Sequence, residues 1–190
     1  MFNILLDEKP TSWNGYSVNT DFRIGIQLMQ IVQDKELAER EKTPLMLELL
    51  FPGIAPSDPN ELTECVQWFL GGWYLDKQAK KKETARAFDF DVDQWRIYAA
   101  FRSQYNIDLN TVDLHFWEFM GLLTSLEECA FTRISNLRTQ KIDPKMSKEE
   151  KQALKEAKRI YQLDDTEKVD NQREVDEALA IFQQAVKGNK

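Results

Sequence analysis

Three aspartates at alternate positions are the first residues whose types and spacing could do chemistry. Asp89, Asp91 and Asp93 are spaced like the first, third and fifth ligands of a calcium-binding loop. Such a loop needs glycine at its sixth position and a bidentate glutamate at its twelfth, where this chain has Gln94 and Ala100. We therefore expect the aspartates to lie at a helix start, where unpaired backbone N–H groups favour negative charge, and to bind no metal.

The single histidine and the two cysteines are the second candidate group. A zinc site, or a Cys–His nucleophilic pair, would have to bring Cys65, His115 and Cys129 together from separate helical segments. A histidine between Leu114 and Phe116 is more typical of a hydrogen-bonded core or rim residue. The cysteines lie in apolar helical patterns, which predicts buried free thiols in a reducing compartment.

Phosphate-binding chemistry is not indicated by the glycines. The close pair Gly71-Gly72 follows a predicted helix, whereas a phosphate loop precedes one. Nor does the spacing pair a nucleophile with a base and an orienting group. We therefore expect no catalytic residue, no metal ligand and no cofactor, and we predict that the protein is not an enzyme.

Composition and charge exclude several classes of partner. Of the 190 residues, 42% are hydrophobic and 30% charged, which is typical of a soluble globular protein. The net charge of -7 lies in the first 140 residues, because residues 141–190 hold 11 basic and 11 acidic side chains. This acidity argues against broad binding of nucleic acid or of an anionic membrane. Without a run of ~20 apolar residues or a basic signal-peptide region, the chain is expected to be cytoplasmic.

Two basic segments leave a choice of interpretation. Residues 76–87, which include the cluster from Lys77 to Arg86, indicate a solvated loop or a docking patch for an acidic partner. Farther along the chain, four lysines share one helical face, and a solvated face or a contact with an acidic surface explains them. These four are Lys148, Lys151, Lys155 and Lys158.

The elements that position these residues are predicted to be mostly helical. Asn14-Gly15 between two aromatic residues predicts a type I′ hairpin. A helix capped within Asn19-Thr20-Asp21 should follow and end near Asp34. Its apolar face is expected at Phe22, Ile26, Met29 and Val32.

Prolines mark the next two helix starts. A helix is expected from about Thr43, with Pro44 at its first position. Another begins at Asp58-Pro59 and ends at Gly71-Gly72.

The aromatic stretch 88–126 is expected to form the centre of the core. One helix places Trp95, Tyr98, Arg102 and Tyr105 on a single face, for which core packing is favoured and an interaction hot spot is the alternative. A second helix, from about Thr111, is apolar around much of its circumference.

A helical extension is predicted to follow the core. Ser147 and Glu150 form a capping box, and a final helix carries an apolar stripe that ends near Val186. We thus predict a mainly α fold, a multi-helix bundle with a small N-terminal β-hairpin and a helical C-terminal extension. Residues 1–142 form the expected core domain and residues 143–190 the extension.

Several short motifs follow the predicted hairpin in a distinctive order. They are Asn19-Thr20-Asp21-Phe22-Arg23, Leu49-Leu50-Phe51-Pro52, Trp68-Phe69-Leu70-Gly71-Gly72, Phe88-Asp89-Phe90-Asp91, Ile97-Tyr98-Ala99-Ala100-Phe101, Gln104-Tyr105-Asn106-Ile107-Asp108-Leu109 and Leu114-His115-Phe116-Trp117-Glu118-Phe119. Their joint order resembles the bacteriophage gene product 15 family. The resemblance runs from the hairpin to about residue 142, and more weakly to Tyr161. Two features depart from the family: residues 164–190 look longer than its usual C-terminus, and Phe116 stands where a second tryptophan is common.

The resemblance implies a protein of tailed phages, encoded among the tail genes, commonly just before the tape-measure protein. Proteins from that position often act as tail assembly chaperones, which bind the tape-measure protein and gather tail-tube subunits around it. We therefore expect a non-enzymatic tail assembly protein of the host cytoplasm, with homo-oligomerisation left open. A structural component of the virion tail and a small host-directed regulator or inhibitor are the alternatives.

Spare apolar helix surface would suit a protein that holds another helix in a groove. We hypothesise that a set of aromatic, apolar and basic side chains supplies core and partner-contact surface. The set is Trp95, Tyr98, Arg102, Phe116, Trp117, Val175, Leu179 and Phe182.

Overall fold

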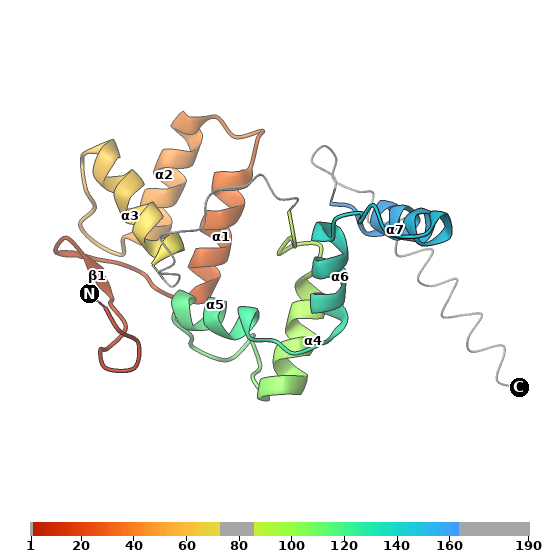
Figure 1. The fold of residues 1–190 in the computed structure, drawn as a ribbon. Helices are drawn as coiled ribbons and strands as arrows, with labels where there is room; N and C mark the ends of the chain where they lie inside the picture. The colour runs from red at the N-terminus through yellow and green to blue at the C-terminus, as the bar shows by residue number, and fades with distance from the viewer. Residues whose placement is uncertain (1, 73–85, 164–190) are drawn as a thin grey trace, which may run out of the picture. The chain divides into compact units, whose positions relative to one another are not determined.

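The computed structural model describes residues 2–72 and 86–163. Within these ranges the chain forms seven helices and one two-stranded antiparallel hairpin, so the fold is mainly α, as predicted (Figure 1). Most of the basic segment 76–87 and the predicted final helix lie outside the described residues. The elements are β1 (Ser12–Trp13), β2 (Tyr16–Ser17), α1 (Phe22–Gln33), α2 (Glu39–Leu50), α3 (Pro59–Gly71), α4 (Gln94–Tyr105), α5 (Phe116–Thr124), α6 (Ala130–Thr139) and α7 (Lys148–Tyr161).

The chain divides into two compact units between Lys141 and Ile142. The first unit contains the hairpin and α1 to α6, and α7 belongs to the second. None of the helices in the described ranges is both long and apolar enough to cross a membrane.

The N-terminal hairpin forms where Asn14-Gly15 predicts it. Trp13 pairs with Tyr16 across the turn. The φ angles of Asn14 and Gly15 are 46° and 85°. Positive φ at both central residues is characteristic of a type I′ turn, whose twist matches that of the two strands.

Three helices begin at their predicted caps. The side chains of Asp21 and Asp58 open α1 and α3, each accepting a hydrogen bond from the N–H two residues on, at 2.8 and 2.9 Å. Ser147 and Glu150 form the capping box of α7, with reciprocal hydrogen bonds of 3.1 and 2.7 Å. These side chains satisfy backbone donors that have no partner inside the helix.

The start of α2 differs from the prediction. The helix begins at Glu39 and not near Thr43, so Pro44 lies inside it. The Glu41 carboxylate accepts a hydrogen bond from the Ala38 N–H at 2.9 Å, which stabilises the earlier start. Pro44 then costs the helix one backbone hydrogen bond without ending it.

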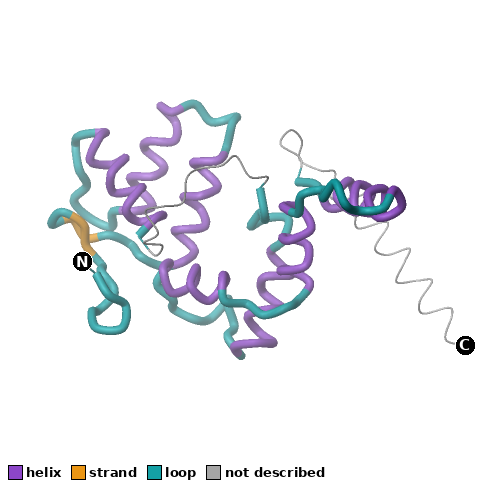
Figure 2. The backbone as a smooth tube through the Cα atoms, viewed as in Figure 1, coloured by secondary structure: helices purple, strands orange, loops and turns teal. Residues whose placement is uncertain are grey.

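The start of α5 also differs, because it lies at Phe116 and not at Thr111. The preceding residues, a loop in Figure 2, run beside the chain that leads into α1. The Phe22 N–H donates to the Leu114 carbonyl at 2.9 Å, and the Phe116 N–H donates to the Thr20 carbonyl at 2.8 Å. Because these backbone groups pair with another segment, they are not available for a helix.

The buried face of α1 is not the predicted stripe. Phe22, Gly25 and Leu28 are buried, whereas Val32 is 46% exposed. The prediction weighed only large apolar side chains and therefore missed Gly25. A Cβ atom at this position would overlap the ring of Phe116, so the glycine allows α5 to approach α1 closely.

The core of the first unit is a network of aromatic rings around α5. The Phe119 ring stacks on Phe22 from α1 and on Phe101 from α4, with centroids 4.8 and 5.2 Å apart. Around this network α1 packs against α2, α3 and α5, while α4 packs against α6 (Figure 1). About half of the buried apolar side chains in the described ranges come from residues 88–126, so this stretch is the core centre that the sequence predicts.

Candidate protein-binding groove

The two faces of α4 have opposite environments. Ile97, Ala100 and Phe101 are buried, and they define the face that packs on the core. Trp95, on the other face, is 75% exposed, and its ring lies at right angles to that of Tyr98, with centroids 6.1 Å apart. Core packing, the favoured interpretation, is therefore wrong for Trp95, since the smaller side chains of the neighbouring face occupy the core.

A groove of about 420 Å³ lies beside Trp95, between α1 and α4, and we call it the Trp95 groove. Buried aromatic rings form part of its lining, and the loop after α4 contributes Leu109 and Asn110. Its lining residues include Phe22, Arg23, Ile26 and Gln30 of α1, Phe90 and Asp91 before α4, Trp95 and Tyr98 of α4, and Phe119 of α5.

Hydrogen bonds fix the two ends of the groove. At one end the Gln30 amide donates to the Asp91 carboxylate at 2.7 Å. At the other, the Arg23 guanidinium donates to the Leu109 carbonyl at 2.8 Å and pairs with Asp21 at 3.0 Å. The walls are thus joined directly, and the groove is preformed in this structure.

The start of α4 is held by a buried ion pair. The side chains of Asp93 and Arg138 are 1% and 4% exposed, and their closest nitrogen and oxygen atoms are 2.5 Å apart. Arg96 adds a second pair to Asp93 at 2.8 Å, and Arg138 also donates to the Ala87 carbonyl at 3.2 Å. Sequence analysis identified Asp93 as a negative charge at a helix start and missed the pair, whose partners lie 45 residues apart.

A larger cavity of about 1320 Å³ lies between the N-terminal segment and α5, and His115 lines it. The Nδ1 atom of His115 accepts the Trp117 N–H at 3.0 Å, and Nε2 lies 3.0 Å from the Pro10 carbonyl oxygen. Since an N–H needs an acceptor and a carbonyl needs a donor, His115 is the neutral tautomer with its proton on Nε2. It caps α5 and ties the N-terminal segment to it, with both ring nitrogens occupied.

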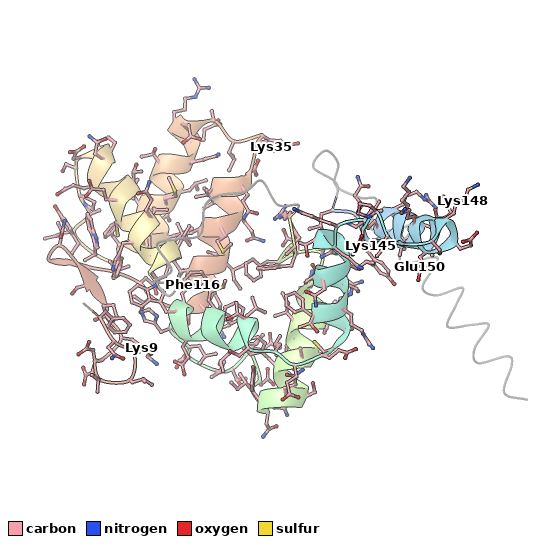
Figure 3. The ribbon with its side chains drawn as sticks, viewed as in Figure 1. Lys9, Lys35, Phe116, Lys145, Lys148 and Glu150 are labelled. Carbon is pink, nitrogen blue, oxygen red and sulfur yellow. The ribbon has the colours of Figure 1, made fainter. Side chains whose placement is uncertain are left out.

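The environment of His115 favours this neutral form. Burial lowers the pKa of the imidazole below its ordinary value; the hydrogen bond to Pro10 opposes this shift, and the charge of Lys9 adds to it. Lys9, labelled in Figure 3, forms an ion pair with Glu118 of α5 at the cavity. The charged groups near His115 therefore tie the chain start to α5.

The cysteines are both free thiols. Cys65 is fully buried in α3, and burial raises its pKa to about 11, so the reactive thiolate is scarce at neutral pH. Cys129 is half-buried at the start of α6. In the described ranges no group of three or more His, Cys, Asp or Glu side chains is placed to hold a metal ion, and the zinc candidates form no such group with His115.

Asp89 and Lys151, two of the remaining candidates, have local partners. The Asp89 carboxylate accepts hydrogen bonds from the Asp91 and Val92 N–H groups, so it closes a turn before α4. On α7, Lys151 donates to the Pro144 carbonyl at 2.8 Å, while Lys148, labelled in Figure 3, is exposed.

The hypothesised contact residues are divided between core and surface. Phe116 is fully buried and Trp117 is 6% exposed, so both belong to the core. Trp95 and Tyr98 meet at the groove, and the exposed Arg102 lies one helical turn beyond Tyr98. The other three, Val175, Leu179 and Phe182, lie outside the described residues.

Comparison with known protein families agrees with the resemblance seen in the motifs. The family described as Bacteriophage Gp15 protein matches residues 7–163. No curated protein and no solved structure matches the chain. Because the family match spans most of the chain, from just before the hairpin to the end of α7, this phage protein belongs to the Bacteriophage Gp15 protein family.

Proposed function

We propose that this protein is a non-enzymatic tail assembly chaperone that acts in the host cytoplasm and binds the tape-measure protein, the tail-tube protein or both. Membership of the Gp15 family supports a structural or tail-region role. The observation that carries the binding role is Trp95, a large aromatic side chain that is 75% exposed beside a preformed groove. Tryptophan and tyrosine are enriched in interface hot spots, and apolar grooves between helices receive partner helices.

The chemistry of the reactive side chains supports binding over catalysis. Both nitrogens of His115 are engaged by backbone groups, so the ring has no free position for proton transfer. The Cys65 thiol is buried, with its pKa raised to about 11. These groups stabilise the fold, whereas Trp95 and Tyr98 offer surface to another molecule.

In this proposal the chaperone covers an apolar stripe of a helical partner before the tail is complete. Such a stripe would otherwise associate nonspecifically, since large exposed apolar patches promote aggregation. The groove presents apolar and aromatic side chains from α1 and α4, which makes it suited to a single helix.

Co-expression with the neighbouring phage proteins tests the proposal. We expect the tagged chain to co-purify with the tape-measure or the tail-tube protein, and the double variant Trp95→Ala/Tyr98→Ala to lose most of the bound partner. Ile54→Ala is the matched control, because Ile54 is an apolar side chain, 84% exposed, that does not line the groove. Soluble partners that do not associate with the chain would contradict the proposal.

Two further measurements separate the alternatives. Mass spectrometry of purified particles should find the protein absent, whereas many copies per particle would indicate a structural tail component. Purification from host lysate should enrich no host enzyme in a Trp95-dependent manner. Enrichment of a host enzyme would instead indicate a regulator or inhibitor.

A further inference from the structure

We propose that the Trp95 groove selects a basic amphipathic helix, with one apolar stripe flanked by lysine or arginine side chains. This inference rests on the proposed function insofar as that function makes the groove a binding face. It adds the length and charge of the segment that the groove receives.

The length follows from the two fixed ends of the groove. Arg23 and Gln30 mark these ends on α1, and a step of seven residues along a helix spans about 10 Å. This length accommodates about two turns of a partner helix. A helix that lies along the groove would therefore present apolar side chains at i, i+3 or i+4, and i+7.

The charge follows from two carboxylates beside the groove. Asp91 lines it, and its carboxylate accepts a hydrogen bond from the neutral Gln30 amide at 2.7 Å. Asp108 accepts the Asn110 N–H at 3.0 Å and the Tyr98 hydroxyl at 3.4 Å. Within residues 2–72 and 86–163, neither aspartate has a lysine or arginine partner.

The cation that lines the groove does not balance these carboxylates. Arg23 is paired with Asp21 at 3.0 Å and donates to the Leu109 and Val112 carbonyls at 2.8 and 3.1 Å. Its charge is therefore already neutralised. The first 140 residues as a whole are acidic as well, since they hold all of the net charge of -7.

The aromatic rings at the groove, exposed Trp95 and half-buried Tyr98, favour the same partner. The faces of tryptophan and tyrosine attract cations, and tryptophan does so most strongly. Trp95 and Tyr98 can therefore bury the apolar stem of a lysine or arginine and attract its charged end. A carboxylate at the same place would meet both Asp91 and the negative ring face.

Titration with synthetic peptides tests the selection. The probe is a peptide of about 18 residues built from leucine, alanine and lysine with one apolar stripe, since shorter helices are marginal in water. The comparison peptide carries glutamate in place of every lysine, and a third has the lysine peptide's composition in scrambled order. We expect calorimetry to show binding of the lysine peptide alone, weakened by salt.

Variants of the full chain place the binding at the groove. Trp95→Ala should weaken it about tenfold or more, as for a hot-spot residue. Asp91→Asn with Asp108→Asn should weaken it about threefold to tenfold, by removing two partly exposed charges. Arg40→Gln is the matched control: it removes a positive charge from an exposed position on α2 that does not line the groove, and it should leave binding unchanged.

The following results would contradict the inference. Equal binding of the glutamate and lysine peptides, or of the scrambled peptide, removes the claim of selection. Binding that Trp95→Ala leaves unchanged places the peptide elsewhere. If no peptide binds while the tape-measure protein still co-purifies, the inference is wrong and the proposed function stands on another surface or chemistry; if both fail, the proposed function fails as well.

Discussion

Trp117 and Trp95 are the same residue type in opposite environments. Trp117, in α5, is 6% exposed; its ring centroid lies 5.3 Å from that of Trp68, and its indole N–H donates to the Phe69 carbonyl at 2.7 Å. Trp95, in α4, is 75% exposed and has a ring contact with Tyr98. The aromatic residues of this chain therefore have two different roles. Those around α5 form the core, and those on the open face of α4 form a surface.

What separates the two tryptophans is the number of elements around each. α5 packs against α1, and its rings also meet α3 and α4, so five of its nine residues are buried. α4 packs mainly on α6 and leaves one face open. A buried indole also needs an acceptor for its N–H, which Phe69 supplies to Trp117.

Replacing each tryptophan by alanine tests directly whether the two side chains contribute differently to stability. Trp117→Ala should lower the free energy of unfolding by about 3–5 kcal/mol, because it leaves a cavity in the core. Trp95→Ala should change it by no more than about 0.5 kcal/mol, as for a surface residue. Urea unfolding followed by circular dichroism measures both. Similar losses at the two sites would show that Trp95 stabilises the fold.

The buried ion pair between Asp93 and Arg138 fixes the start of α4, the helix that presents Trp95. Arg138→Ala should lower the free energy of unfolding by about 3–5 kcal/mol, since it leaves Asp93 buried with only Arg96 as a cationic partner. Arg96→Ala, at a partly exposed side chain, should cost less than half as much. Chemical denaturation of both variants gives the ratio, and equal losses would contradict a dominant role for Arg138.

Gly25 tests how tightly the core around α5 is packed. Gly25→Ala should destabilise the protein by about 1–3 kcal/mol, because the added Cβ overlaps the Phe116 ring. Gly121→Ala is the control within α5, since a Cβ there meets no atom within 4 Å. The control should be neutral or stabilising by up to about 1 kcal/mol, through helix propensity. Thermal unfolding distinguishes them, and a stabilising Gly25→Ala would mean that the core is loosely packed.

His115 should give the smallest effect, and a pH-dependent one. His115→Ala removes the cap of α5 and should cost about 1 kcal/mol at neutral pH. Because burial lowers the histidine pKa in the folded state, the unfolded chain takes up the proton first as pH falls. This contribution is therefore fully present above about pH 6.5 and is lost progressively below that value.

The variant His115→Asn isolates this titration. Asparagine can still cap the helix but does not titrate near neutral pH. The difference in unfolding free energy between the natural chain and this variant, measured from about pH 8 to about pH 5, removes the background from carboxylates. A difference that moves in favour of the natural chain as pH falls would contradict the neutral form assigned to His115 in the folded state.

Short sequence motifs predicted much of the fold. Asn14-Gly15, Asp58-Pro59 and Ser147 with Glu150 each act within a few residues, so the hairpin, α3 and α7 begin where predicted. The two displaced helix starts have different causes, a local hydrogen bond of Glu41 at α2 and pairing with a distant segment at α5. Pro44 is tolerated inside α2, and the segment before α5 pairs with the chain that leads into α1.

The groove was harder to predict because its parts are distant in sequence. Trp95 and Tyr98 were identified as a possible hot spot, but their spacing does not say whether that face of α4 is covered. Phe116 and Trp117 share the aromatic character of that pair and are buried. Only the packing of other elements against α4 and α5 decides between core and surface.

The buried thiol of Cys65 gives the protein a built-in probe of opening. Alkylating reagents react with the thiolate, and this side chain is fully buried with a pKa of about 11. Labelling at this position therefore requires α3 to separate from the core, so its rate measures a rare opening motion. Cys129, half-buried at the start of α6, should react first. Comparing the labelling rates of the two thiols, with and without a bound partner, would show whether occupying the groove slows opening at both α3 and α6 or at only one of them.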